Sequence, residues 1–142
     1  MTPEDHDARS PMKPTELREY SALVRRARSA MSEDREASLG LHEMTAAGRT
    51  YELMRVVLGR GAPRRVLLSA GIHGDELAGV EALCEWLETR AYVKFLQRWD
   101  ITMLPCLNPW GYEHGTRENG EGQDLNREFN SSHPPQEVLF VQ

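Results

Sequence analysis

The strongest constraint on the fold is a strand–turn–helix–strand pattern in the middle of the chain. Residues 66–70 form a short apolar run, typical of a strand buried on both faces of a parallel sheet, and the run stops at Gly71. A helix is expected from about Asp75, with its apolar side chains on one stripe, and a second apolar run follows at 101–107. Strand, helix and strand in this order form a βαβ unit. The sequence therefore predicts an α/β fold with a mainly parallel mixed sheet flanked by helices.

The segments before this pattern fall into a leader, a helix and a strand. Residues 1–14 carry three prolines and several charges, which favours a mobile leader. Residues 15–48 are predicted to form an N-terminal helix, capped by Thr15, and a connection that includes 32–41. A strand is expected at 51–58, where apolar and polar residues partly alternate.

The segment after the pattern has a different character. Residues 108–132 are rich in Gly, Asn, Asp, Glu and Arg and show no sustained periodicity. A loop of this length is uncommon in a small domain unless it carries function. Two prolines at 134–135 then favour the start of a last, apolar helix.

Composition argues against several classes of protein. The chain of 142 residues has 17 Lys and Arg against 22 Asp and Glu, so its net charge of −5 would repel nucleic acid and anionic membranes. No apolar run approaches the ~20 residues of a spanning helix, and the acidic N-terminus is unlike a secretory signal. Cys84 and Cys106 lie in apolar stretches, which suits reduced thiols and a cytoplasmic location. The oligomeric state is not predicted.

A pair of candidate metal ligands follows the first buried strand. His73 and Glu76 are separated by two residues, close enough for an imidazole nitrogen and a carboxylate oxygen to meet one metal ion. Zinc accepts such ligands at ~2.0–2.2 Å, and the carboxyl ends of strands are where open α/β sheets bind ligands. The alternative is a loop histidine beside a helix-capping acid, and the spacing alone favours that alternative.

Further motifs give this pair a context. They are Asn-Pro-Trp-Gly at 108–111, Thr-Arg-Glu-Asn at 116–119 and Asp-Leu-Asn-Arg at 124–127. With Gly-Ile-His-Gly-Asp-Glu at 71–76, they resemble the zinc metallocarboxypeptidases related to carboxypeptidase A, most of all the compact bacterial branch that trims murein peptides. The resemblance runs from about 51 to 129, and Trp110 departs from it, because the family usually has aspartate there. More distantly, the chain resembles deacylases of the succinylglutamate desuccinylase and aspartoacylase type.

The resemblance implies a role for each matched residue. His73 and Glu76 match two zinc ligands, Arg117 matches the arginine that polarises the scissile carbonyl, and Asn126 and Arg127 match the pair that holds the terminal carboxylate of the substrate. The chemistry agrees, because a guanidinium fork pairs bidentately with a carboxylate and a lysine cannot.

Two points remain open for these residues. Asp124 is expected either to orient the loop or to contact the second nitrogen of a ligand histidine. Arg117 and Arg127 could instead form ordinary surface ion pairs. Their candidate partners in the sequence are Glu118, Glu121 and Glu128.

The implied activity is zinc-dependent removal of a C-terminal residue from small peptides that carry a free carboxylate. In the family, a third ligand histidine and a general-base glutamate lie well downstream of the Asn-Arg pair, and neither His133 nor Glu137 fits those positions. Residues 49–142 are therefore predicted to form the N-terminal part of a carboxypeptidase-like catalytic domain, incomplete at its C-terminus and inactive alone. The alternatives are a deacylase acting on an acyl-amino acid and a catalytically dead carboxylate-binding module.

Overall fold

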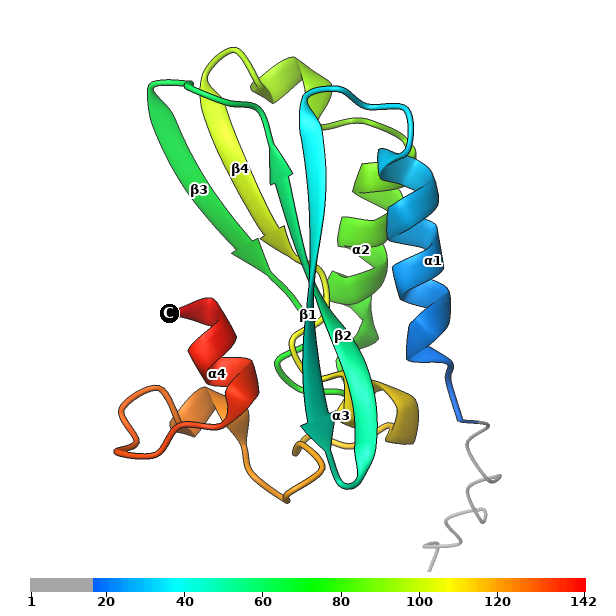
Figure 1. Cartoon of the computed structure of the whole chain (residues 1–142), viewed down its shortest axis with the longest axis vertical. Coiled ribbons are helices and arrows are strands. Elements are labelled where there is room, and N and C mark those ends of the chain that lie inside the picture. Colours follow the sequence, from blue (N-terminus) through cyan, green and yellow to red (C-terminus); the bar gives the residue numbers. More distant parts are fainter. Residues whose placement is uncertain (1–16) are drawn as a thin grey trace, which may run out of the picture.

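The computed structural model describes residues 17–142, so the expected leader at 1–14 and the Thr15 helix cap lie outside the described residues. Figure 1 shows one sheet with helices packed on it. None of the helices in this part of the chain has the length and apolar character needed to cross a membrane. The elements are α1 (Tyr20–Met31), β1 (Ala37–Ala46), β2 (Arg49–Leu58), β3 (Arg64–Ser69), α2 (Leu77–Glu88), η1 (Val93–Phe95), β4 (Trp99–Leu104), α3 (Pro109–His114), η2 (Leu125–Arg127) and α4 (Gln136–Val141).

The sheet has four strands in the order β1-β2-β4-β3. The predicted α/β fold, with a mixed sheet and flanking helices, is confirmed, as are the strands β2, β3 and β4. Parallel pairing is less extensive than expected, because β3 and β4 form the one parallel pair of the described sheet and β2 pairs antiparallel with both of its neighbours. The β1–β2 hairpin turns at Ala47 and Gly48, both with positive φ, and such a tight turn permits antiparallel pairing alone.

The prediction of a connection at 32–41 is wrong for residues 37–41, which belong to strand β1. All ten of its residues pair with β2, and Leu39 and Leu41 pack against the core. The positions that alternate with these leucines carry Gly40 and His42 and then the buried Met44 and Ala46, so the buried side of the strand changes along its length and conceals the alternation in the sequence. The boundary expected after residue 48 therefore falls at the turn of a hairpin.

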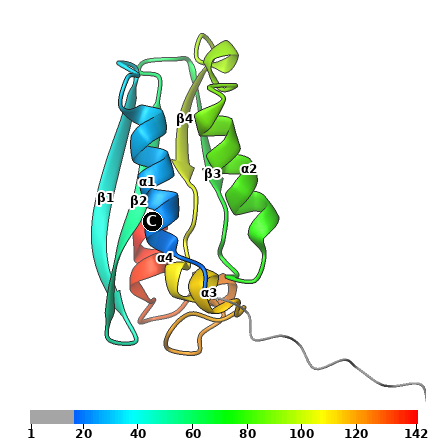
Figure 2. The same cartoon turned by 90° about the vertical axis from the view of Figure 1, so that its right-hand side faces the viewer.

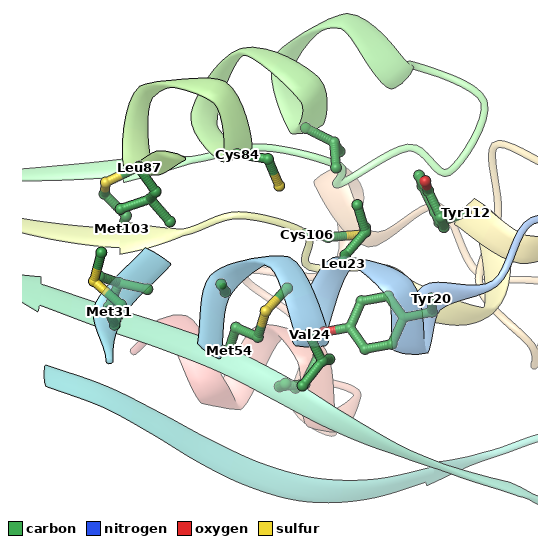
Figure 3. Close-up of a cluster of buried hydrophobic side chains, with 14 of the residues drawn as sticks. Tyr20, Leu23, Val24, Met31, Met54, Cys84, Leu87, Met103, Cys106 and Tyr112 are labelled. Atoms are coloured by element: carbon green, nitrogen blue, oxygen red, sulfur yellow. The ribbon is translucent and has the colours of Figure 1, made fainter. Parts of the chain in front are cut away.

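Helices α1 and α2 lie side by side on one face of the sheet, α1 over the hairpin and α2 over β3 and β4 (Figure 2). Helix α1 buries residues at spacings of three and four, as expected, although Glu19 rather than Thr15 is its N-cap residue. The core fills the space between these helices and the sheet (Figure 3). Its labelled members include Leu23 and Met31 of α1, Leu87 of α2 and Met103 of β4.

Arg26 also joins the two helices. Its guanidinium pairs with Glu88 at 2.7 Å and with Glu81 at 2.8 Å, both on α2. Arg26 therefore reaches the neighbouring helix across the surface of the layer.

Strand β3 is less buried than its apolar sequence predicts. It is last in the order of the described sheet, so only β4 pairs with it. Val66 and Leu68 are half-buried, whereas the Leu67 side chain, which points to the other face, is 48% exposed. An apolar run identified a strand but not its place in the sheet, because edge position depends on pairing between distant segments.

Glu113 of α3 is a buried carboxylate that holds three elements together. Its Oε1 accepts the backbone N–H of Tyr20 at 3.0 Å, and its Oε2 accepts the Tyr51 hydroxyl at 3.0 Å and pairs with Arg49 at 2.8 Å. Burial and the adjacent Glu113 raise the pKa of Tyr51 to about 12, so the hydroxyl remains a donor at neutral pH. Helix α1 and strand β2 are thereby fixed against α3.

Replacing this carboxylate should destabilise the fold. Glu113→Ala leaves the Tyr20 N–H and the Tyr51 hydroxyl without their acceptor, and we expect a loss of about 2–3 kcal/mol in the free energy of unfolding. Urea unfolding followed by circular dichroism measures this loss. Glu85→Ala, at an exposed position of α2, is the matched control and should change the free energy by less than about 0.5 kcal/mol. Equal stabilities of the two variants would contradict the role of Glu113.

Candidate active site

The candidate site lies at the carboxyl ends of β3 and β4, at the lower end of the sheet in Figure 1. Because these strands are parallel, both chains leave the sheet at the same edge. Their pairing continues into the loops, since the Leu107 N–H donates to the Ala70 carbonyl at 3.0 Å and the Asn108 N–H to the Gly71 carbonyl at 2.9 Å. The first candidate motif and the start of α3 are therefore held together by backbone hydrogen bonds.

Two glycines allow these loops to approach closely. A Cβ added to Gly74 would lie 1.9 Å from the carbonyl carbon of Gly111, and a Cβ on Gly111 would lie 2.5 Å from Nδ2 of Asn108. Both distances are far below van der Waals contact. The loop that carries His73 is therefore seated directly on the backbone of α3.

His73 and Glu76, the predicted ligand pair, are brought together. Nδ1 of His73 lies 3.1 Å from Oε1 of Glu76. The His73 side chain is 8% exposed, whereas that of Glu76 is 65% exposed, so the pair opens to solvent on the glutamate side. Helix α2 begins at Leu77, two residues later than expected, and Glu76 is its N-cap residue.

The donor set of this pair fits zinc at two positions. Two ligand atoms at ~2.1 Å from one tetrahedral ion lie about 3.4 Å apart, close to the 3.1 Å between Nδ1 and Oε1. Nε2 of His73 lies 3.1 Å from Oδ1 of Asp124. A neutral imidazole donates from one ring nitrogen and offers a lone pair at the other, and the Glu76 side of His73 is the open one.

Asp124 is the centre of the polar cluster. Besides His73, its carboxylate accepts Nε–H of Arg117 at 3.1 Å, pairs with Nε of Arg127 at 3.5 Å and accepts the backbone N–H of Asn126 at 3.1 Å. Desolvation raises the pKa of Asp124, but the hydrogen bonds from His73 and Arg117 outweigh it, and the pKa lies below its usual value. Asp124 is therefore a carboxylate at neutral pH.

The structure brings the two arginines to one carboxylate. Arg117 and Arg127 both pair with Asp124, so the alternative of ion pairs with neighbouring glutamates is not the arrangement found. Both contacts use Nε, which leaves the forked Nη ends out of this pairing. Arg117 is 45% exposed and Arg127 80% exposed. Asn126 contributes its backbone N–H, and the residue itself is exposed.

Two buried asparagines organise the loop at 108–132, and sequence reasoning missed this role for both. Asn108 accepts the N–H of Gly111 at 2.9 Å as the N-cap of α3, and its Nδ2 donates to the carbonyls of Arg117 and Glu118 at 3.3 and 3.1 Å. Asn119 closes the following turn. An Asn-Pro pair after a strand is a recognisable N-cap signal, whereas nothing local to Asn119 predicts its burial.

The departure at Trp110 leaves the turn intact. Helix α3 still begins with the Asn108 cap and Pro109, and the Trp110 ring stacks on His114 with their centroids 4.0 Å apart.

The other candidate groups lie elsewhere. Among residues 17–142, no set of three His, Cys, Asp or Glu side chains is placed to hold one metal ion. His133 contacts the Ser132 hydroxyl, and Glu137 accepts a hydrogen bond from Asn119. His42 stacks on Phe140 of α4.

Comparison with known proteins agrees with these motifs. The family model described as the succinylglutamate desuccinylase/aspartoacylase catalytic domain matches residues 62–138, more than half of the chain. Murein peptide amidase A of Escherichia coli K12 is 41% identical over 63 residues, a match that covers 44% of this chain and 24% of the amidase. The chain thus spans about a quarter of the length of this curated relative.

Solved structures share the fold. A metallo-carboxypeptidase from Pseudomonas aeruginosa, in complex with (2-guanidinoethylmercapto)succinic acid, has a TM-score of 0.64 and 25% identity, over 87% of this chain and 34% of that one. A succinylglutamate desuccinylase/aspartoacylase from Rhodobacter sphaeroides has a TM-score of 0.61 and 22% identity, over 77% of this chain and 36% of that one.

The contact between Gly74 and α3 can be tested directly. Gly74→Ala drives a methyl group into the backbone of Gly111, so we expect the free energy of unfolding to fall by about 3 kcal/mol or more. Gly40→Ala is the control, because the nearest atom to its added Cβ is the Arg55 carbonyl oxygen at 3.7 Å, and it should stay within about 1 kcal/mol of wild type. Thermal and urea unfolding measure both. A Gly74→Ala variant as stable as Gly40→Ala would disprove the close seating of the loop.

Proposed function

The chain belongs to the succinylglutamate desuccinylase/aspartoacylase catalytic-domain family, and from this membership we propose that it contributes to the zinc-dependent hydrolysis of an amide bond near a free carboxylate. One observation carries the proposal. His73 lies between two carboxylates, Glu76 on its open side and Asp124 on its buried side, and Asp124 also holds two arginines.

In this proposal, Nδ1 of His73 and the Glu76 carboxylate would hold a zinc ion, which would supply polarisation of a carbonyl and activation of water. Asp124 accepts a hydrogen bond from Nε2–H of His73 and so keeps the proton on that nitrogen. The lone pair of Nδ1 is then left facing Glu76. A carboxylate in this position also makes the imidazole a stronger ligand.

The two arginines are suited to bind the negative charge that the substrate carries and the negative charge that develops during the reaction. The Arg117 guanidinium, fixed through Nε, is suited to polarise the scissile carbonyl and to stabilise the oxyanion that develops from it. Arg127 and Asn126 lie next to it on η2 and are suited to hold a terminal carboxylate, which would fix the neighbouring amide bond over the reacting groups.

We propose a small peptide with a free C-terminus as the substrate, because murein peptide amidase A is 41% identical to this chain over 63 residues. The second candidate is an N-acyl amino acid, favoured by the desuccinylase/aspartoacylase family model. Both substrates offer a carboxylate to Arg127. The third possibility is a binding module without catalysis. The buried free thiols of Cys84 and Cys106 support action in a reducing compartment such as the cytoplasm.

Zinc binding tests the ligand assignment. We expect His73→Ala to weaken zinc binding at least about tenfold, and Asp124→Ala to weaken it about 10–100-fold, because the histidine loses its orienting acceptor. Isothermal titration of the 142-residue chain with zinc measures both effects. His133→Ala, an exposed loop histidine, is the control and should bind zinc as wild type does. Wild-type affinity in His73→Ala would refute the assignment.

Carboxylate binding tests the substrate class. The described residues offer two zinc ligands, so we expect no peptide hydrolysis by these 142 residues and use binding as the measurement. A dipeptide with a free C-terminus should bind, as followed by NMR titration, and its C-terminal amide should not. Arg127→Lys should weaken binding of the free acid about tenfold, because a lysine cannot pair bidentately. Arg98→Lys, near the amino end of β4, is the control. Equal binding of acid and amide would count against this substrate class.

A further inference from the structure

Glu137 is a buried carboxylate that the proposed reaction does not use. It lies in the first turn of α4 and is 2% exposed. Apolar side chains of Ile72, Leu125 and Val138 line the same small pocket as Glu137. Burial raises the pKa of Glu137. A carboxyl group is costly in such surroundings unless it makes a specific contact.

The specific contact of Glu137 is with Asn119. Nδ2 of Asn119, itself 1% exposed, donates to Oε1 of Glu137 at 3.3 Å. Oδ1 of Asn119 already accepts two backbone N–H groups, from Glu121 at 3.1 Å and from Gln123 at 2.9 Å. The amide must therefore present its NH₂ group to the interior, where Glu137 accepts from it and Oε1 of Gln123 is a second acceptor at 3.4 Å. A leucine or methionine at 137 would fill the space without accepting this hydrogen bond.

The turn that Asn119 closes separates two residues of the candidate site. Arg117 precedes the turn by two residues, and Asp124 follows it. The Asn119 N–H also donates to the Gln123 carbonyl at 3.0 Å, so 119 and 123 are joined through both side chain and backbone. Asn108 holds the carbonyl of Arg117 from the other side at 3.3 Å. The geometry of the turn thus determines whether Nε of Arg117 reaches Asp124.

We propose that Glu137 is a positioning residue of the active site. By accepting from Asn119, it fixes the turn at 119–123 and thereby the contact between Arg117 and Asp124. Its importance for catalysis rests on the proposed function, in which Arg117 acts on the substrate, whereas its effect on the Arg117–Asp124 contact does not.

The experiment exchanges donor and acceptor between the two side chains. Asn119→Asp places two carboxylates face to face, and Glu137→Leu removes the acceptor while keeping the packing. The double variant Asn119→Asp/Glu137→Gln restores one donor and one acceptor in the opposite direction. Val138→Ala is the control, because it weakens the packing of α4 and leaves the Asn119 contact in place.

NMR hydrogen exchange of the Arg117 Nε–H and of the Gln123 amide measures the result without metal or substrate. Loss of the buried hydrogen bond should accelerate both exchange rates about tenfold in Asn119→Asp and in Glu137→Leu. The double variant and Val138→Ala should stay within about twofold of wild type, although Val138→Ala unfolds at a lower temperature. Recovery in the double variant would assign the effect to the hydrogen bond between residues 119 and 137.

Two results would overturn the proposal. One is exchange in Asn119→Asp or Glu137→Leu equal to that in Val138→Ala, and the other is a double variant no better than Asn119→Asp. If Glu137→Leu fails to fold, the exchanged pair decides alone. Failure of wild-type protein to bind zinc would count against the proposed function and leave the exchange result standing.

Discussion

The carboxylate of Asp124 is the interaction on which the arrangement of the candidate site depends. It contacts His73, Arg117 and Arg127, which come from two separate loops and a 3₁₀ turn. Without it, a buried imidazole and two guanidiniums would face one another, and like charges would separate the loops. Its lowered pKa follows from these donors and keeps it charged at neutral pH. One residue thus contacts the imidazole and orients both arginines.

Buried polar groups hold the segments that present this carboxylate. Hydrophobic periodicity specifies the sheet and its two long helices, but the chain from Asn108 to Arg127 has little apolar surface to bury. Hydrogen bonds of buried polar side chains stabilise this part of the chain instead. Each of these side chains is almost fully buried and is hydrogen-bonded to another segment: Asn108, Glu113, Asn119 and Glu137. Such contacts have strict geometry and are costly to break, so they fix loops that packing alone would leave variable.

The parts predictable from sequence are those with local signals. Strand β2, the βαβ unit and the pairing of His73 with Glu76 follow from apolar runs and from spacing or motif. Strand β1 was missed because its buried positions change face along the strand, from Leu39 and Leu41 to Met44 and Ala46, and because its membership in the sheet depends on pairing with β2. Leu67 is exposed because β3 is last in the order of the described sheet, and that order is not readable from a local pattern. The contact of Asp124 with the second nitrogen of His73 was one of its two expected roles. The burial of Glu137 arises instead from contacts with segments distant in sequence, which no local pattern encodes.

The two arginines differ in a way that matches their proposed roles. A donor that stabilises the charge developing on a reacting carbonyl must already be in place, because reorientation of the donor during the reaction costs part of the stabilisation. Arg117 meets this condition, since Asn108 holds its carbonyl, Asn119 closes the turn after it, and Asp124 fixes its Nε at 3.1 Å. Arg127 is 80% exposed and its contact with Asp124 is longer, at 3.5 Å. An exposed and loosely held side chain can reach a carboxylate that arrives from solvent. The more constrained arginine is therefore assigned to the reaction and the more exposed one to binding.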